Sequence, residues 1–196
     1  MQKTLKQCIA SALFANMFFG ASAYAFTPCD SCKSETGEVQ LCAPAVVAGF
    51  ERIDYPDAVV AQQIAYRHTL LAGYNQAENR LAVTFYLYDR VVDSDAEDIN
   101  ETAFAVKEVL SVHHGSRLQM GGRTSLSVGG EMKRGHSALF NWREGAEDYA
   151  SFLWIMPLDK RFMKIRATYV RPRGSEGEAM TSTLNAVKAI ADQVCR

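Results

Sequence analysis

The sequence predicts an α+β fold in which an antiparallel sheet carries one inserted helix and one C-terminal helix packed on it. In residues 136–143, 148–158 and 162–171, apolar side chains recur at every second position, as they do in strands with a buried face. The connections between these strands are only a few residues long, which permits antiparallel hairpins but not parallel crossovers. Two amphipathic segments, beginning near residues 94 and 176, predict the helices.

Shorter strands are expected before these hairpins. Residues 80–90, RLAVTFYLYDR, alternate most clearly between two faces. Two further strands are expected over residues 48–55 and 62–69, and residues 70–79 are expected to form a loop around Gly73 and Asn75. The glycine-rich stretch from 113 to 137 indicates one or two strands with turns at 121–122 and 129–130.

Each helix is expected to begin at a capping box, in which a hydroxyl and a carboxylate satisfy free backbone N–H groups. The first box is Ser94 to Glu97, and its helix should run to about residue 113. The second box is Ser175 to Glu178. The expected buried stripes are Ile99, Ala103, Val106 and Leu110 on the first helix, and Met180, Leu184, Val187, Ala191 and Val194 on the second.

The order of these elements resembles that of the PsbP/Mog1/DcrB-type α/β sandwich. The resemblance rests on RLAVTFYLYDR, on the helix from Ser94, and on FMKIRATYVRP running into the C-terminal helix, and it covers residues 46–194. It implies a non-catalytic accessory or binding role and brings no catalytic residue with it.

Residues 1–25 have the layout of a secretory signal peptide. Lys3 and Lys6 precede an apolar run, and Ala23-Tyr24-Ala25 provides a small-x-small cleavage site. Its removal leaves a cysteine-bearing arm, residues 26–45, and a single α+β domain, residues 46–196. No later segment is apolar for the length of a membrane span, so the mature chain is expected to be soluble and periplasmic or secreted.

Four cysteines remain after this cleavage: Cys29, Cys32, Cys42 and Cys195. An even number in an oxidising compartment favours two structural disulfides. Three pairings are possible, of which we favour Cys29–Cys42 with Cys32–Cys195, and in each of them Cys195 joins the arm. A redox-active CxxC usually follows a strand and lies at the N-terminus of a helix, which lowers the thiol pKa, but the residues around 29–32 predict neither element. A structural zinc site usually takes its ligands as two close pairs, whereas Cys42 and Cys195 are far apart in the chain.

The net charge argues against one class of partner, and the charge is unevenly distributed along the chain. The mature chain has 19 basic and 22 acidic side chains, which argues against a nucleic-acid binder. Residues 26–114 carry 14 acidic and 6 basic side chains, whereas residues 115–173 carry 11 basic and 5 acidic ones. We expect the two parts to neutralise each other within one sheet.

The best candidate for a functional surface is a basic face formed by Lys164, Arg166, Arg171 and Arg173. Strand alternation places Lys164 and Arg166 on the same side of the sheet, where they could meet a protein or a small anionic ligand. His113 and His114 are adjacent on a helix, so they point about 100° apart and are poorly placed to chelate one ion. No catalytic residue, metal site or cofactor is predicted.

These features favour an exported, non-catalytic binding or accessory protein. Two alternatives remain open at this point. One is an enzyme whose catalytic residues are dispersed along the chain, and the other is a periplasmic thiol-disulfide protein that uses Cys29 and Cys32.

Overall fold

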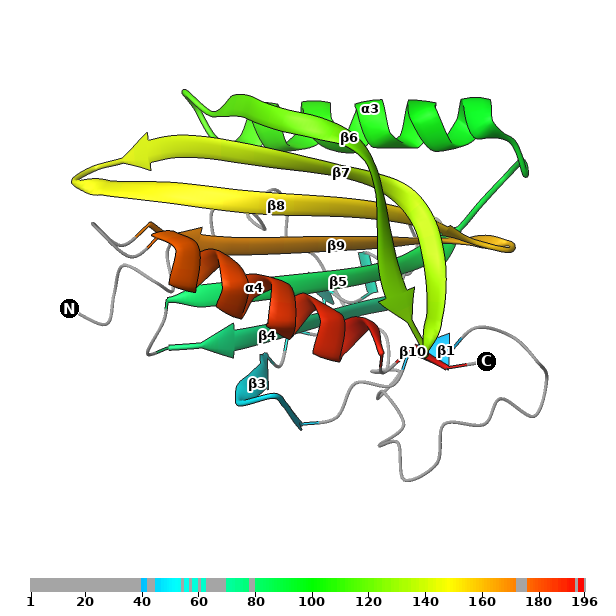
Figure 1. Cartoon of the computed structure of the whole chain (residues 1–196), viewed down its shortest axis with the longest axis horizontal. Helices are drawn as coiled ribbons and strands as arrows, with labels where there is room; N and C mark the ends of the chain where they lie inside the picture. The colour runs from blue at the N-terminus through cyan, green and yellow to red at the C-terminus, as the bar shows by residue number, and fades with distance from the viewer. Residues whose placement is uncertain are drawn as a thin grey trace.

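The computed structural model describes residues 40–41, 45–53, 55–56, 58–59, 61–62, 70–77, 80–171, 176–192 and 194–195 (Figure 1). Eight strands form one antiparallel sheet in the order β2-β3-β4-β5-β9-β8-β7-β6. Their bounds are β2 Val46–Val47, β3 Phe50–Ile53, β4 Leu70–Gln76, β5 Leu81–Asp89, β6 Arg117–Val128, β7 Glu131–Glu144, β8 Glu147–Leu158 and β9 Arg161–Val170. A separate two-stranded sheet pairs β1 Gln40–Leu41 with β10 Val194–Cys195.

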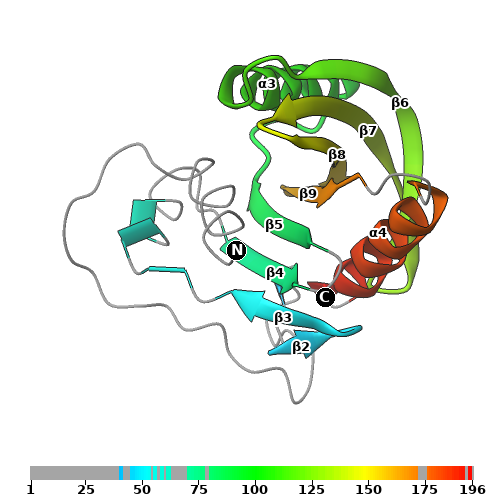
Figure 2. The same cartoon turned by 90° about the vertical axis from the view of Figure 1, so that its left-hand side faces the viewer.

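Two long helices lie on opposite faces of the eight-stranded sheet (Figure 2). The helix α4 (Glu176–Ala191) covers the face that carries Phe85, Trp154 and Ile165. The helix α3 (Asp95–Val112) covers the other face, beside Phe140 and Ile155. The predicted α+β class, with one inserted and one C-terminal helix on an antiparallel sheet, is confirmed. Among the described residues, no helix is both long and apolar enough to cross a membrane.

The hairpins of the second half are confirmed, with one correction. Strands β7, β8 and β9 pair antiparallel in succession, as the short connections predict. The expected turn at Gly121-Gly122 is wrong, because β6 runs straight through these residues. Between β6 and β7 the chain turns at Gly129 and Gly130, whose positive φ angles of 56° and 80° favour glycine.

The expected loop over 70–79 is also wrong, because residues 70–76 form β4. Gly73 does not mark a turn there. It pairs with Thr84 of β5, and the phenol of Tyr55 occupies the space where a Cβ atom would lie. A glycine is therefore required at position 73 because the Tyr55 ring packs directly against the backbone there. The strand expected over 48–55 is present but shorter, as β3 over residues 50–53. Of the second expected strand, 62–69, only Gln62 is described, and it is helical.

Helix α3 begins as predicted, but only half of the capping box forms. The Ser94 hydroxyl accepts a hydrogen bond from the Glu97 N–H at 3.2 Å. The Glu97 carboxylate accepts instead from the N–H groups of Val91 and Val92, at 3.0 and 2.6 Å. The carboxylate therefore holds the loop that leads into the helix.

The buried stripe of α3 is not the one that the apolar periodicity predicts. The buried side chains are Glu101, Ala105 and Val109, and Val106 of the predicted stripe packs partly buried against the same core. Ala103 is exposed, Ile99 is 54% exposed and Leu110 is 38% exposed. Two polar contacts with β5 and its end account for this rotation. The Tyr88 hydroxyl donates to Glu101 at 2.7 Å, and Arg90 Nη2 donates to Asp98 at 2.6 Å.

Helix α4 departs from its predicted stripe in the same way. Val187 and Ala191 are buried as expected, but Met180 and Leu184 are exposed and Val194 lies in β10. The remaining buried positions are Thr183, Ala186 and Ile190. The end of α4 is held by the β6–β7 turn, because the Gly129 N–H donates to the Ala191 carbonyl at 3.2 Å.

Candidate ligand-binding site

Lys164 and Arg166 lie together on the side of β9 that faces α3. In the sheet register Lys164 is opposite Tyr86 of β5, and Arg166 is opposite Thr84. Neither cation lies on an open face. The Lys164 side chain is only 15% exposed, and Arg166 is half-buried.

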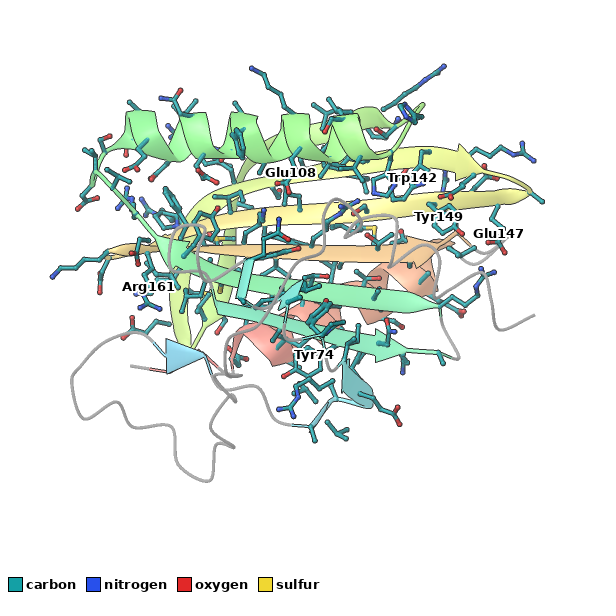
Figure 3. All side chains as sticks on the ribbon, turned by 180° about the vertical axis from the view of Figure 1, so that it is seen from behind. Tyr74, Glu108, Trp142, Glu147, Tyr149 and Arg161 are labelled. Carbon is teal, nitrogen blue, oxygen red and sulfur yellow. The ribbon has the colours of Figure 1, made fainter. Side chains whose placement is uncertain are left out.

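Lys164 is paired with a carboxylate of the covering helix. Its Nζ atom lies 3.0 Å from Glu108 Oε2 and 4.5 Å from the centroid of the Tyr86 ring. Figure 3 labels Glu108 on α3 above the sheet. The pair also joins the acidic first part of the chain to the basic second part, as the charge distribution predicts.

Arg166 is held by neutral groups. Its Nε–H donates to Ser151 Oγ at 3.2 Å, and its Nη2 atom lies 2.6 Å from His113 Nε2. The Ser151 hydroxyl is in turn 2.9 Å from Thr168 Oγ1. Among the described residues, no carboxylate lies within 4.0 Å of the Arg166 guanidinium.

These contacts determine the protonation of His113. A guanidinium can only donate, so His113 Nε2 must accept and the ring proton must lie on Nδ1. Burial, and secondarily the charge of Arg166, lowers the pKa of His113 to about 4. The imidazole is therefore neutral at physiological pH.

Burial also acts on the other ionisable groups of this cluster. It lowers the pKa of Arg166, although the nearby Tyr86 and Glu108 oppose that effect. Burial raises the pKa of Tyr86, so its hydroxyl stays protonated. The cluster therefore contains two cations, Lys164 and Arg166, but only one carboxylate, Glu108, which is bonded to Lys164.

Two aromatic rings extend the cluster along β7 and β8. The Trp142 ring stacks on His113 with ring centroids 4.2 Å apart, and on Tyr149 at 5.4 Å. Trp142 and Tyr149 are labelled in Figure 3. The buried Trp142 Nε1–H has no acceptor among the described residues. We refer to Lys164, Arg166, His113, Ser151 and Trp142 together as the cationic layer.

The cationic layer has more hydrogen-bond donors than acceptors. Arg166 has five N–H groups, and two of them are engaged by Ser151 and His113. Such a cluster can accept an anion, because a carboxylate or phosphate supplies both the missing acceptors and the missing charge. Within the described residues no group of three or more His, Cys, Asp or Glu side chains is close enough to hold a metal ion.

The other predicted site residues are placed less completely. The Arg171 N–H, just beyond β9, donates to the Asp148 carbonyl at 2.8 Å, while Arg173 lies outside the described residues. Cys29, Cys32 and Cys42 also lie outside them. Only the backbone of Cys195 is described, in β10, where it is the register partner of Gln40.

Sequence reasoning missed the neutral members of the layer. His113 was considered only as a possible metal ligand together with His114, and Ser151 was not considered. The sequence did contain one signal for Ser151, which is the only serine or threonine in the run 149–156, YASFLWIM. In the structure this whole run of β8 is buried. A fully buried serine requires a hydrogen-bond partner, which Arg166 and Thr168 provide.

The fold and site together define an α+β sandwich domain with a cation-bearing interface between its sheet and one covering helix. No protein-family model and no curated protein matches the chain, so the resemblance to the PsbP/Mog1/DcrB-type sandwich stays a prediction.

Solved structures that are similar to the chain include the following two. One is LpqN, a Mycobacterium tuberculosis protein involved in cell envelope biogenesis, with 11% identity over 80% of this chain and 82% of that one and a TM-score of 0.46. Another is PA94 of Pseudomonas aeruginosa, a protein of unknown function, with 11% identity over 55% of this chain and 70% of that one and a TM-score of 0.36. Neither similarity assigns a function to this chain.

Proposed function

We propose that the protein is an exported, non-catalytic binding or accessory protein, and that its ligand is a small anion held by Arg166 and Lys164 of the cationic layer. One observation carries this proposal. Arg166 is half-buried, is held only by neutral partners, and has no carboxylate within salt-bridge distance among the described residues.

The energetics of burial support a ligand at this position. Removing a guanidinium from water carries a penalty of several kcal/mol, which structural arginines normally offset with a carboxylate partner. Arg166 lacks this partner, and the one nearby carboxylate, Glu108, is bonded to Lys164. An anionic ligand would supply the missing counter-charge.

Each residue of the layer has a distinct role in this proposal. Arg166 offers its planar guanidinium to two ligand oxygens, and Lys164 adds a second positive charge. Ser151 and neutral His113 fix the orientation of the guanidinium. Arg171 and Arg173, which follow β9 in the chain, belong to the same proposed basic face.

The test is a nitrogen-15 NMR titration of the protein with inorganic phosphate and, separately, with acetate. The chain has two tryptophans, so each indole N–H gives one resolved signal. We expect the signal of Trp142 to shift, while that of Trp154, on the α4-facing side of the sheet, stays in place. The variant Arg166→Met should lose this shift, and the control Arg143→Met, at an exposed arginine, should keep it.

A negative titration would be decisive. If neither anion moves the Trp142 signal at high millimolar concentration, or if Arg166→Met responds as the wild type does, the cationic layer is not an anion site. The non-catalytic binding role would then lose the observation on which it rests.

We further propose that the exported form begins at Phe26 and that Cys195 is disulfide-bonded to the cysteine-bearing arm. The pairing of β1 with β10 supports this, because it brings Gln40 of the arm opposite Cys195. Peptide mapping of periplasmic protein without reduction should find Cys195 linked to Cys29, Cys32 or Cys42. A free Cys195 would contradict the proposal, and a Cys29–Cys32 bond that a mild dithiol reduces would favour thiol-disulfide exchange instead.

A further inference from the structure

One half of the edge strand β6 is covered by neither helix. All seven residues from 117 to 123 are exposed, although strand side chains alternate between the two faces of a sheet. Neither α3 nor α4 therefore shields this segment, which we call the uncovered half of β6. In Figure 2 the strand lies at the end of the sheet, with β7 on its inner side.

The outer edge of this segment has unused hydrogen-bonding capacity. β6 is the last strand in the sheet order, and no described strand pairs with its outer side. An edge strand presents backbone N–H and C=O groups that can pair with another extended chain. The segment also exposes two apolar side chains, Leu118 at 48% and Met120 at 60%.

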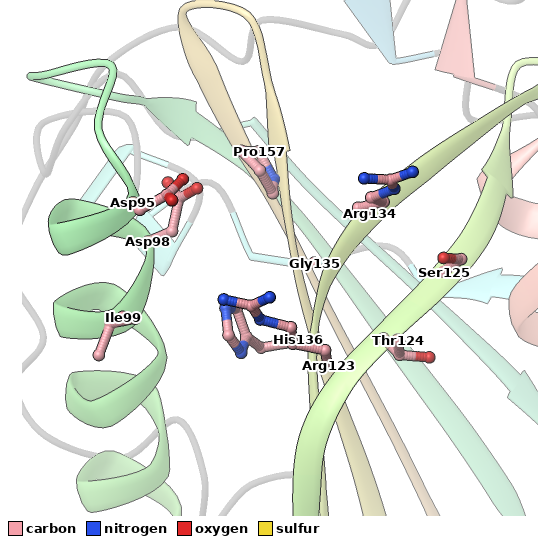
Figure 4. Close-up of a pocket in the computed structure, with 10 residues that line it drawn as sticks. All are labelled: Asp95, Asp98, Ile99, Arg123, Thr124, Ser125, Arg134, Gly135, His136 and Pro157. Carbon is pink, nitrogen blue, oxygen red and sulfur yellow. The ribbon is translucent and has the colours of Figure 1, made fainter.

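A cavity of about 480 Å³ lies beside this edge, between the start of α3 and the β6–β7 hairpin (Figure 4). Its strand wall carries Arg123, Arg134 and His136, and its helix wall carries Asp95 and Asp98. Arg123 and His136 are register partners on neighbouring strands, so their side chains lie on the same face.

The charge of this cavity is predominantly positive. Asp98 is already neutralised by Arg90, at 2.6 Å. Arg123 and Arg134 form no ion pair with any described residue, and both are exposed. The cavity therefore offers two unpaired guanidinium groups against one unpaired carboxylate, Asp95.

We propose that the uncovered half of β6 and the adjoining cavity dock an extended, acidic segment of a partner polypeptide, which adds to the sheet as a ninth strand. This partner site is separate from the cationic layer and does not rest on the anion proposed there. Charge complementarity selects the partner. The only charged residues of β6 are Arg117 and Arg123, so two copies of β6 would both be positively charged, whereas a segment that carries acidic residues has the opposite sign.

The two faces of the sheet define the pattern of side chains that the partner needs. Leu118 and Arg123 are register partners of Phe140 and His136, which places them on the α3-facing side, next to the cavity. Met120 is opposite Leu139 and so lies on the other side, after a register shift between Leu118 and Met120. The partner should therefore carry acidic residues toward Arg123 and the cavity, and apolar residues toward Met120. Arg117, opposite Asn141, lies on Met120's side at the end of the segment, so an acidic residue is also favoured next to it.

The test uses a fluorescent synthetic peptide of alternating valine and glutamate as its probe. We expect it to bind by fluorescence anisotropy and to slow hydrogen exchange at the amides of β6. The variant Arg123→Glu should weaken binding by about tenfold or more, which corresponds to the loss of one close charge pair. The control Lys188→Glu reverses an exposed lysine of α4, which packs on the other face of the sheet, and should leave binding unchanged.

Two further peptides separate strand addition from simple charge attraction. A peptide of the same composition, N-methylated at alternate residues, cannot complete the backbone ladder and should not bind. A valine–lysine peptide should not bind either. Equal binding of the methylated peptide, absence of protection in β6, or failure of the valine–glutamate probe to bind would overturn the proposal. Concentration-dependent protection of β6 without any peptide would overturn it in favour of a second copy of this chain.

Discussion

Replacing Arg166 by methionine should leave the free energy of unfolding almost unchanged in the absence of an anion. The substitution removes two hydrogen bonds made by a charged donor, to Ser151 at 3.2 Å and to His113 at 2.6 Å. Bonds of this kind contribute about 1.5–3 kcal/mol each. Ser151 keeps its contact with Thr168, and His113 keeps its stacking on Trp142, so neither partner is left without a neighbour.

The gain from the same substitution is of similar size. A half-buried guanidinium without a counter-ion carries a desolvation penalty of several kcal/mol, and methionine of similar length removes it. The depressed pKa of Arg166 agrees in direction, because burial disfavours its charged form. The two contributions should cancel to within about 1 kcal/mol.

Urea denaturation followed by circular dichroism measures this balance. As a control, Phe85→Ala at a fully buried position of β5 should lower the free energy of unfolding by about 3–5 kcal/mol. Phosphate should stabilise the wild type but not Arg166→Met, since a ligand stabilises only a protein that binds it. A loss of more than about 3 kcal/mol in Arg166→Met would refute the reasoning and make the guanidinium a structural group.

Three further predictions follow from particular contacts. The hydrogen bonds from Arg80 and then from Tyr149 lower the pKa of Glu147 from 4.5 to about 2, so this carboxylate should stabilise the fold above pH 4.5 and lose that effect as the pH falls toward 2. Because the pair is partly exposed, we expect about 1 kcal/mol or less, measured as the difference in pH-dependent stability between the wild type and Arg80→Gln. Val109→Gln should destabilise by about 3 kcal/mol, whereas Ile99→Gln should change stability by less than about 0.5 kcal/mol; the reverse order in thermal unfolding would support the face that the periodicity predicts. Gly135→Ala should cost about 2 kcal/mol in urea unfolding, because the new Cβ would collide with the backbone of β8, and a neutral effect would contradict the close packing seen there.

The sequence was most informative where one face of a strand is uniformly apolar. Phe140 and Trp142 on β7, and Trp154 and Met156 on β8, alternate as the pattern predicts, and the short connections dictated their antiparallel pairing. The C-terminal helix began where its capping box indicated. Local chemistry decided each of these features, so local patterns could reveal them.

Prediction failed where contacts between distant residues decide the structure. The rotation of α3 depends on Tyr88 and Arg90, which hold Glu101 and Asp98 against the sheet, and no periodicity within the helix encodes these partners. Gly73 was taken for a loop residue because its role depends on Tyr55, 18 positions earlier in the chain. In the candidate site, alternation placed Lys164 and Arg166 on one side, but could not show that His113 and Ser151 would meet Arg166 there.

The seam between β5 and β9 has a consequence for how the chain folds. Strands β2 to β5 are neighbours both in sequence and in the sheet, and so are strands β6 to β9. The two meanders meet only where Leu81–Asp89 pairs with residues 161–169, across the 71 intervening residues from 90 to 160. Each meander can assemble from local contacts, while closing the seam requires a long loop to be ordered first. The pairing of β5 with β9 should therefore limit the rate of folding. Lengthening the turn at 129–130 should change that rate only slightly, because this turn lies within one meander.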